Sequence, residues 1–198
     1  MDKQRIFLII APNECSVELT KRDKILQTTL KLLVKQGLQE TAMSQISRES
    51  GVATGTIYHY FKGKNDIINN LYLEIKRDFG QVLLKGTDSS GNYQQRFSKV
   101  WRNLFNYYLK NELQFRFAQH IGHLPIINEE TRQAGQRYYQ PVIDFLREGI
   151  NNGELKNIDL QLLTETLHGN IVALVQIALN NKKIFKEELI EQAIRISW

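Results

Sequence analysis

The feature that most constrains this chain is a short segment, residues 43–61, with the pattern of two helices joined by a tight turn. Gly51 lies where a sharp interhelical turn needs a residue that readily adopts a positive φ. Ile46, Val52 and Ile57 are spaced to share one small core on the two sides of that turn. The segment therefore predicts a helix-turn-helix, in which the second helix projects from the core as a probe.

The second helix of this segment carries small or polar side chains whose hydrogen-bonding ends can reach base edges in a major groove. Two lysines follow it directly, and their charge suits a phosphate backbone. Thr41 and Ser44 precede it, and they are also the two candidates to cap the helix that starts near Met43. We expect the DNA-binding residues to be Thr41, Ser44, Thr54, Gly55, Thr56, Tyr58, His59, Tyr60, Lys62 and Lys64.

Residues at helical spacing, all apolar except Thr29, flank the segment on both sides and predict that three or four helices close one small core. These residues are Ile25, Leu26, Thr29, Leu32, Leu33 and Leu38 before the turn, and Ile67, Ile68, Leu71 and Leu73 after it.

From about Lys21 to Leu73 the chain resembles the TetR family of tetracycline-repressor-like transcriptional regulators. The matching residues are Ile46, Gly51, Val52, Gly55, Thr56, Ile57, Tyr58, Tyr60, Phe61, Lys64 and Ile67, and the departures are Ala42, Ser47, Ser50 and Ala53. The resemblance implies an all-α fold, with a helix-turn-helix domain of three helices joined by a connecting helix to a C-terminal helical domain that binds ligand and dimerises. It also implies that Lys64 contacts phosphate.

Composition agrees with an all-α protein, because the 198 residues include only three prolines and long stretches of 3.6-residue periodicity. The net charge is +5, and its distribution is uneven. Residues 1–64 carry ten Lys or Arg against six Asp or Glu, while residues 65–198 carry sixteen against fifteen. The positive excess therefore belongs to the N-terminal part of the chain, which contains the predicted DNA-binding segment.

We expect three parts: an arm over residues 1–20, a DNA-binding domain over 21–73, and an effector-binding and dimerisation domain over 74–198. The arm either packs its apolar run 6–11 on a neighbouring surface or is disordered. That run is too short to span a bilayer. Two interpretations of the arm are left open: Lys3 and Arg5 contact the minor groove of DNA, or the start codon has been assigned too far upstream. The single cysteine, Cys15, cannot form an internal disulfide, which fits a cytoplasmic protein.

Beyond a connecting helix from Asp66 to about Gln81, a turn-rich break over residues 86–92 separates a second set of helices. Their expected ranges are Tyr93–Lys110, Glu112–His120, Glu129–Asn151, Asp159–Asn180 and Lys186–Ser197. The fourth carries an apolar stripe wider than one core contact needs. In the family the last two long helices form the dimer interface, so we expect a homodimer through Leu163, Leu167, Ile171, Leu174, Val175 and Ala178. The alternative is that this helix is simply central in the monomer.

Aromatic and histidine side chains concentrate in the same part of the chain, as in an effector pocket or in a helical core. The expected pocket residues are Trp101, Phe105, Tyr108, Phe117, His120, Tyr138, Phe145 and His168. The His120-x-x-His123 pair has no third ligand nearby in the sequence, so we expect no metal site and no cofactor.

No phosphate loop, nucleophile elbow or metalloprotease motif is present in the sequence, so we expect no enzyme. The expected function is a homodimeric repressor that leaves a near-palindromic DNA operator when a small-molecule effector binds, with no membrane partner. The alternative is a DNA-binding protein of the same fold that answers to a protein partner or to no ligand.

Overall fold

The computed structural model describes residues 19–87, 91–181 and 185–198, and every regular element in these ranges is helical. The all-α prediction is confirmed. All but the last two residues of the expected arm lie outside the described residues. The elements are α1 (Lys21–Glu40), α2 (Met43–Ser50), α3 (Thr54–Tyr60), α4 (Lys64–Leu83), α5 (Tyr93–Lys110), α6 (Glu112–His120), α7 (Glu129–Gln136), the 3-10 turn η2 (Arg137–Tyr139), α8 (Gln140–Asn151), α9 (Leu160–Asn181) and α10 (Glu187–Ser197).

The chain forms two compact units, which we call the head and the body. The head runs to Asp78 and also includes Leu113–Gly135, while the body comprises Phe79–Glu112 and Gln136–Trp198. This division differs from the predicted boundary after residue 73. The reason is that Phe117, Ile121 and Ile127 are buried in the same core as α1 to α4.

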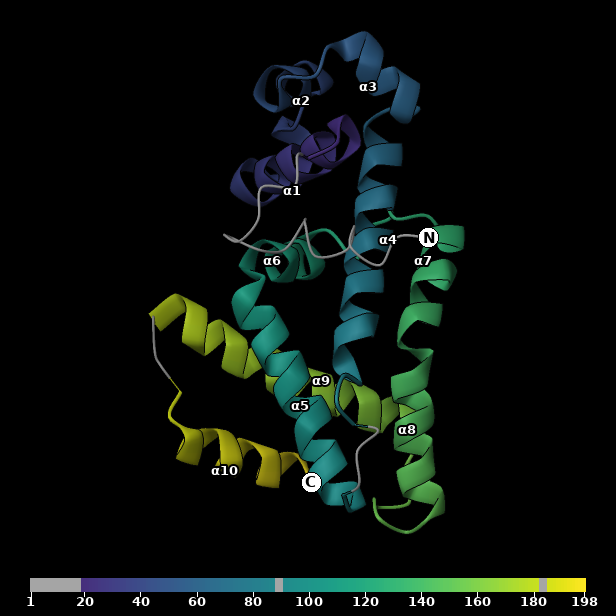
Figure 1. The fold of residues 1–198 in the computed structure, drawn as a ribbon, viewed down its shortest axis with the longest axis vertical. Coiled ribbons are helices and arrows are strands. Elements are labelled where there is room, and N and C mark those ends of the chain that lie inside the picture. The colour runs from purple at the N-terminus through teal and green to yellow at the C-terminus, as the bar shows by residue number, and fades with distance from the viewer. Residues whose placement is uncertain (1–18, 88–90, 182–184) are drawn as a thin grey trace. The chain divides into compact units, whose positions relative to one another are not determined.

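The head core is made of the side chains that the apolar periodicity singled out. Figure 1 shows α2 and α3 next to each other, with α1 beside them and the long α4 following. Leu38 and Leu73 pack against the core partly buried, whereas the other apolar residues are almost fully buried. Those buried residues are Ile25, Leu26, Leu32, Leu33, Ile46, Val52, Ile57, Ile67, Ile68 and Leu71.

Polar contacts tie α4 to the rest of the head. The Arg22 guanidinium at the start of α1 forms an ion pair with Glu74 and donates a hydrogen bond to Asn70 Oδ1 at 3.2 Å. Further along the head, Asn69 Nδ2 donates to the Ile126 carbonyl at 2.8 Å, and Asn69 Oδ1 accepts from the Asn128 amide at 3.0 Å. The loop between α6 and α7 is thus fastened to α4.

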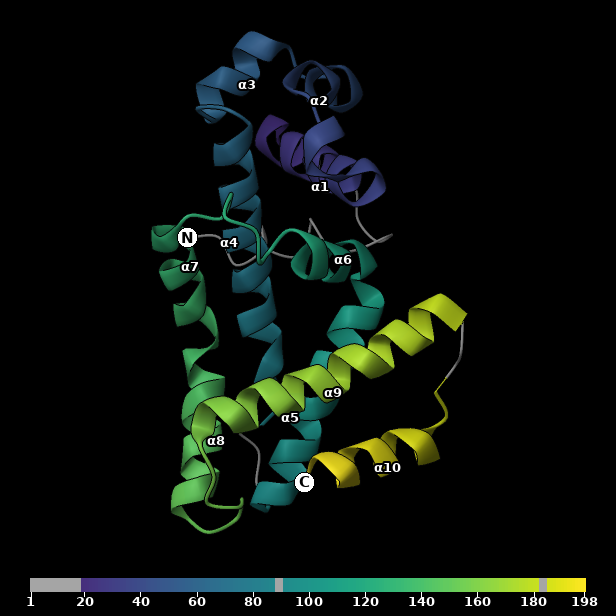
Figure 2. The ribbon, with the colours of Figure 1, turned by 180° about the vertical axis from the view of Figure 1, so that it is seen from behind.

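In the body, α9 packs against α5 and α8, and Figure 2 shows α9 crossing in front of α5. The predicted single helix 129–151 is wrong, because η2 separates α7 from α8. Pro141 in the first turn of α8 has no amide hydrogen and disfavours helical geometry before it, which explains the break. At η2 the backbone comes so near to α4 that a Cβ on Gly80 would lie 2.1 Å from the Tyr138 carbonyl oxygen.

Asp78, in the last third of α4, carries a buried carboxyl group. Its Oδ1 has no hydrogen-bond partner among the described residues. Burial raises the pKa of Asp78 to about 7, although the neighbouring Arg77 opposes the shift. An unfolded chain releases this proton near pH 4, so folding becomes less favourable as the pH rises between about 4 and 7.

We therefore expect Asp78→Asn to increase the free energy of unfolding at about pH 8 by up to about 4 kcal/mol, and so to raise the melting temperature. This gain should vanish toward about pH 4. Thermal unfolding across this pH range is the measurement. The control is Asp144→Asn on α8, because Asp144 is exposed and its pKa is lowered by hydrogen bonds from Gln140 and Arg147. A pH-independent difference for Asp78→Asn would contradict a buried titrating carboxyl.

Candidate nucleic-acid interface

The turn between α2 and α3 has the geometry that the sequence predicts. Gly51 ends α2 with a φ of 69°, in the left-handed region. The two serines that stand at departures from the family pattern bond to the turn itself: Ser47 Oγ donates to the Val52 carbonyl at 2.8 Å, and Ser50 Oγ accepts from the Val52 amide at 3.3 Å. With Ile46, Val52 and Ile57 buried on one side, the opposite side of α3 is left to solvent.

The exposed side of α3 carries most of the predicted base-reading and phosphate-contacting side chains. Tyr58 and Tyr60 are 54% and 43% exposed, which is unusual for large aromatic side chains. Thr56 is half-buried, and the other polar or small residues on this helix are exposed, namely Thr54, Gly55 and His59. Together these residues form a polar surface on a helix whose other side is anchored in the head core.

The prediction for Thr41 is wrong. Its side chain is fully buried, and its Oγ1 donates to the Gly37 carbonyl at 2.8 Å, so it cannot contact DNA. It also does not cap α2, and neither does Ser44, because the N-cap residue is Ala42 and no side chain bonds to the free amides. Gly37, with a φ of 83°, breaks the helical path here and brings its carbonyl to Thr41. Ser44 is exposed, as a DNA contact requires.

The two lysines after α3 differ in their surroundings. Lys62 is exposed, and within the described part of the chain only its backbone amide forms a hydrogen bond, which it donates to Asp66 Oδ2 at 2.8 Å. Lys64 is half-buried, and its Nζ donates to the Leu38 carbonyl at 3.0 Å. Lys64 therefore joins the start of α4 to the end of α1, while two of its three ammonium protons stay available for another acceptor.

In the body, two of the predicted pocket residues meet directly. Tyr108 Oη lies 2.9 Å from His168 Nε2. Phe79 stacks on Tyr108 with ring centroids 5.8 Å apart, and it also contacts the rings of Tyr107 and Tyr139. We call Phe79, Tyr107, Tyr108, Tyr139 and His168 the ring cluster. Burial raises the pKa of Tyr108, which keeps its hydroxyl protonated as a hydrogen-bonding group at neutral pH.

The remaining predicted pocket residues do not join the ring cluster. Trp101 and Phe105 stack on each other as core side chains, and Trp101 Nε1 donates to Ser197 Oγ on α10 at 3.1 Å. Phe145 stacks on Tyr93 with ring centroids 4.7 Å apart. Tyr138 points to solvent and is 38% exposed.

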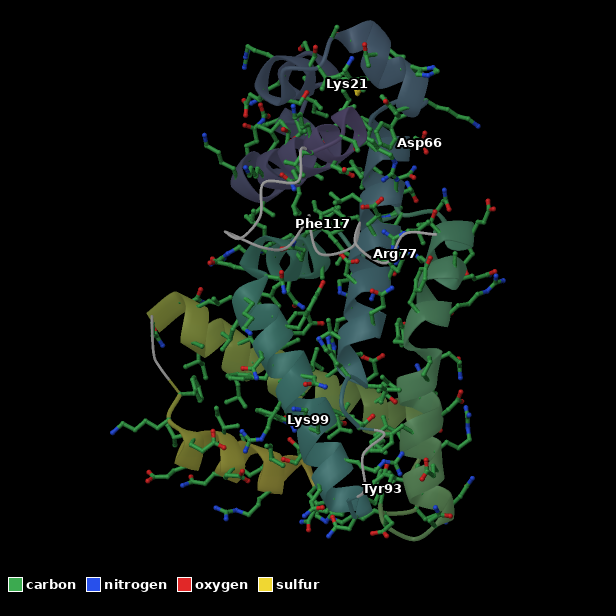
Figure 3. The ribbon with its side chains drawn as sticks, viewed as in Figure 1. Lys21, Asp66, Arg77, Tyr93, Lys99 and Phe117 are labelled. Carbon is green, nitrogen blue, oxygen red and sulfur yellow. The ribbon has the colours of Figure 1, made fainter. Side chains whose placement is uncertain are left out.

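Phe117 and the exposed His120 belong to the head, so the predicted pocket is not a single site. Figure 3 marks Phe117 on α6, and its side chain is part of the head core. Sequence reasoning left Phe79, Tyr107 and Tyr139 out of the predicted pocket. Tyr107 and Tyr139 lie in the aromatic-rich stretch of the sequence, whereas Phe79 lies outside it, on the connecting helix. The described residues contain no group of three potential metal-ligating side chains.

The predicted interface stripe of α9 is corrected in part. Ile171, Val175 and Ala178 are buried within the chain itself, so they have no surface to offer a second copy. Leu163, Leu167 and Leu174 are half-buried. The exposed side of α9 instead carries Leu162, Gly169, Ala173 and Ile177, which we call the α9 outer face. Among the described helices, α9 alone has the length and hydropathy of a membrane span, a test that core helices of soluble proteins also pass.

Two family models match the chain. Residues 25–71 match the model described as "Bacterial regulatory proteins, tetR family". Residues 92–198, more than half of the chain, match the model described as "Tetracyclin repressor-like, C-terminal domain".

Relatives and solved structures agree with these matches. An HTH-type transcriptional regulator of Haemophilus influenzae is 27% identical over 89 residues, a match that covers 45% of this chain and 48% of that protein. A tetR family transcription regulator from Shewanella sp. PV-4 superimposes with a TM-score of 0.83 and 26% identity, covering 91% of this chain and 97% of that one. The regulator FadR from Bacillus subtilis, solved in complex with stearoyl-CoA, has a TM-score of 0.71 and 23% identity over 88% of this chain and 96% of its own.

The different surroundings of Lys62 and Lys64 predict different mutant behaviour. Lys62→Ala should leave the melting temperature unchanged. It should reduce the salt slope, which is the steepness with which the logarithm of the binding constant for random-sequence duplex DNA falls with the logarithm of salt concentration, by about 0.9 per subunit, the value for one lost phosphate contact. Lys64→Ala should lower stability by about 1 kcal/mol, because the Leu38 carbonyl loses its donor. Thermal unfolding and fluorescence anisotropy over a salt series measure both. An unchanged melting temperature for Lys64→Ala would show that its bond to Leu38 is not structural.

Proposed function

The chain belongs to the TetR family of bacterial transcriptional regulators, and we propose that it is a cytoplasmic homodimeric repressor that a small-molecule effector releases from a near-palindromic operator. The observation that carries this proposal is the exposed polar side of α3, on a helix whose apolar side is fixed in the head core by Ile57. A short helix held in this way can enter a major groove without losing its own fold.

On DNA, α3 divides the work between reading bases and holding the backbone. Thr54, Gly55, Thr56 and His59 have the size and hydrogen-bonding groups to reach base edges. Lys62 contributes an exposed charge, and Tyr58 and Tyr60 contribute exposed hydroxyls, which suit phosphate oxygens. Two such heads in one dimer would read half-sites about 34 Å apart, one helical turn of DNA, or a multiple of that spacing.

The ring cluster is the proposed effector site in the body. Its rings offer an apolar surface, and the Tyr108–His168 hydrogen bond offers one polar point inside it. This combination suits an amphipathic molecule with an apolar body and one polar group. The B. subtilis FadR structure was solved in complex with stearoyl-CoA, whose stearoyl chain is apolar, so stearoyl-CoA is the first probe to test. Release by a factor of 100 requires that the effector favour the unbound form by about 2.7 kcal/mol.

The dimer is proposed to form through the α9 outer face. Leu162 and Ile177 are 60% and 42% exposed, and between them Gly169 and Ala173 leave room for a second helix to approach closely. Large apolar side chains exposed along one helix cost solvation free energy unless another surface covers them. A copy of the same helix related by twofold symmetry would cover them.

Ile177→Arg tests this interface, with Ile158→Arg as its matched control. The two isoleucines are 42% and 41% exposed, but Ile158 lies before α9 begins. Placing a charge in an interface leaves it desolvated and unpaired. We therefore expect Ile177→Arg to give monomers with lost operator binding, and Ile158→Arg to remain dimeric, as measured by sedimentation. If each of the two single variants remains a dimer, the interface lies elsewhere.

Tyr108→Phe tests the effector site, with an operator selected from bound genomic fragments. Stearoyl-CoA should raise the melting temperature of the wild-type chain and lower its operator affinity, because both effects follow from one linked equilibrium. Tyr108→Phe removes the hydroxyl that bonds to His168 and forms the polar point of the ring cluster, so it should weaken stearoyl-CoA binding about tenfold. Tyr93→Phe is the control, since the Tyr93 hydroxyl donates to the Phe145 carbonyl outside the ring cluster.

If neither stearoyl-CoA nor a wider set of amphipathic molecules changes stability or operator affinity, the alternative gains: control by a protein partner, or no ligand control. A Tyr108→Phe effect equal to that of Tyr93→Phe would instead remove the ring cluster as the binding site.

A further inference from the structure

Helix α1 carries four lysines that are all exposed: Lys21, Lys24, Lys31 and Lys35. Their spacings of three, seven and four residues place them along one side of the helix. The opposite side is buried in the head core through residues such as Leu26 and Leu33. We call these four residues the lysine stripe.

The lysine stripe is a surface of one sign. The carboxylates of α1 lie at its two ends, where Asp23 is engaged in a capping box with Thr20 and Glu40 is the last residue. None of the ion pairs recorded among the described residues involves a stripe lysine. A merely solvated face usually mixes both signs of charge. Residues 1–64 have a net charge of +4, and four of the ten basic residues in this range belong to the lysine stripe.

The stripe leads toward the surface that carries the predicted DNA contacts. At its C-terminal end, Gln36 next to Lys35 donates a side-chain hydrogen bond to Gln45 of α2 at 2.8 Å. Two residues later in α1, the Leu38 carbonyl accepts from Lys64 Nζ at 3.0 Å. The last turn of α1, directly after Lys35, is therefore in contact with α2 and with Lys64 after α3. Figure 3 labels its first member, Lys21, in the head.

We propose that the lysine stripe is a second DNA-contacting surface, which binds backbone phosphates flanking the groove that α3 enters. Phosphates are the partner of matching chemistry, because flexible ammonium groups neutralise them without reading sequence. Each neutralised phosphate releases condensed counterions, which makes the contribution strongly dependent on salt. The proposal rests on the proposed function, since a flank exists only if α3 sits in a groove.

The test compares two triple variants with the same change of net charge. The stripe variant is Lys24→Gln, Lys31→Gln and Lys35→Gln, and the control is Lys99→Gln, Lys110→Gln and Lys156→Gln in the body, where all three lysines are exposed. Glutamine keeps the helix propensity of lysine. Binding to random-sequence duplex DNA is measured by fluorescence anisotropy over a salt series, on a duplex no longer than one half-site and on one several half-sites long.

On the long duplex, the stripe variant should lose about two units of salt slope per subunit and bind about 10 to 100 times more weakly at low salt. On the short duplex the loss should disappear, because no flank remains. The control variant should match the wild-type chain on both. The ratio of operator to random-sequence affinity should stay the same for the stripe variant, since no base contact is removed.

Three results would overturn the proposal. Equal losses in the stripe and control variants would show that only net charge matters. No loss in either would make the stripe a solvated face. A stripe variant that loses binding to vesicles of anionic phospholipid, but not to DNA, would assign the surface to a membrane. If the wild-type chain binds no duplex at all, the proposed function is refuted instead. The melting temperature of each variant is measured as a control that it is folded.

Discussion

The burial of Ile57 and Phe61 is the interaction on which the DNA-reading surface depends. Helix α3 has seven residues, and an isolated helix of that length is not stable in water. Ile57 within α3 and Phe61 directly after it, 0% and 2% exposed, fix the helix in the head core, while Gly51 supplies the turn that allows this docking. The polar residues of α3 are therefore held in place by a core to which they contribute nothing, so base contacts can vary without loss of the fold.

Local patterns predicted most of this fold because each of the early helices buries one clear apolar side. The helix-turn-helix and the bounds of α5 and α6 follow from spacing and from cap residues such as Asn92. Failures occurred where a distant contact or a backbone detail decides the outcome. Thr41 has the chemistry of a cap, but the path set by Gly37 turns it inward. Pro141 divides a helix that periodicity made continuous.

Pocket and interface residues were harder to predict, for a different physical reason. Aromatic and aliphatic side chains stabilise a core and line a site with the same chemistry, so only three-dimensional neighbours distinguish Tyr108, next to His168, from Phe105 in the packed core. The same holds for α9, where Val175 is buried and Ile177, two residues later, is exposed. Charge was easier to interpret, because lysines almost always stay at the surface.

The head core draws on two distant parts of the chain, which has a consequence for synthesis. Phe117, Ile121 and Ile127 are 1%, 4% and 1% exposed within a core otherwise built from residues 25–75. On the ribosome the helix-turn-helix emerges first, yet its core stays open until this later segment has been made. At about 5–20 residues per second the delay is several seconds. During that interval the nascent head exposes the apolar surface that these three side chains later cover.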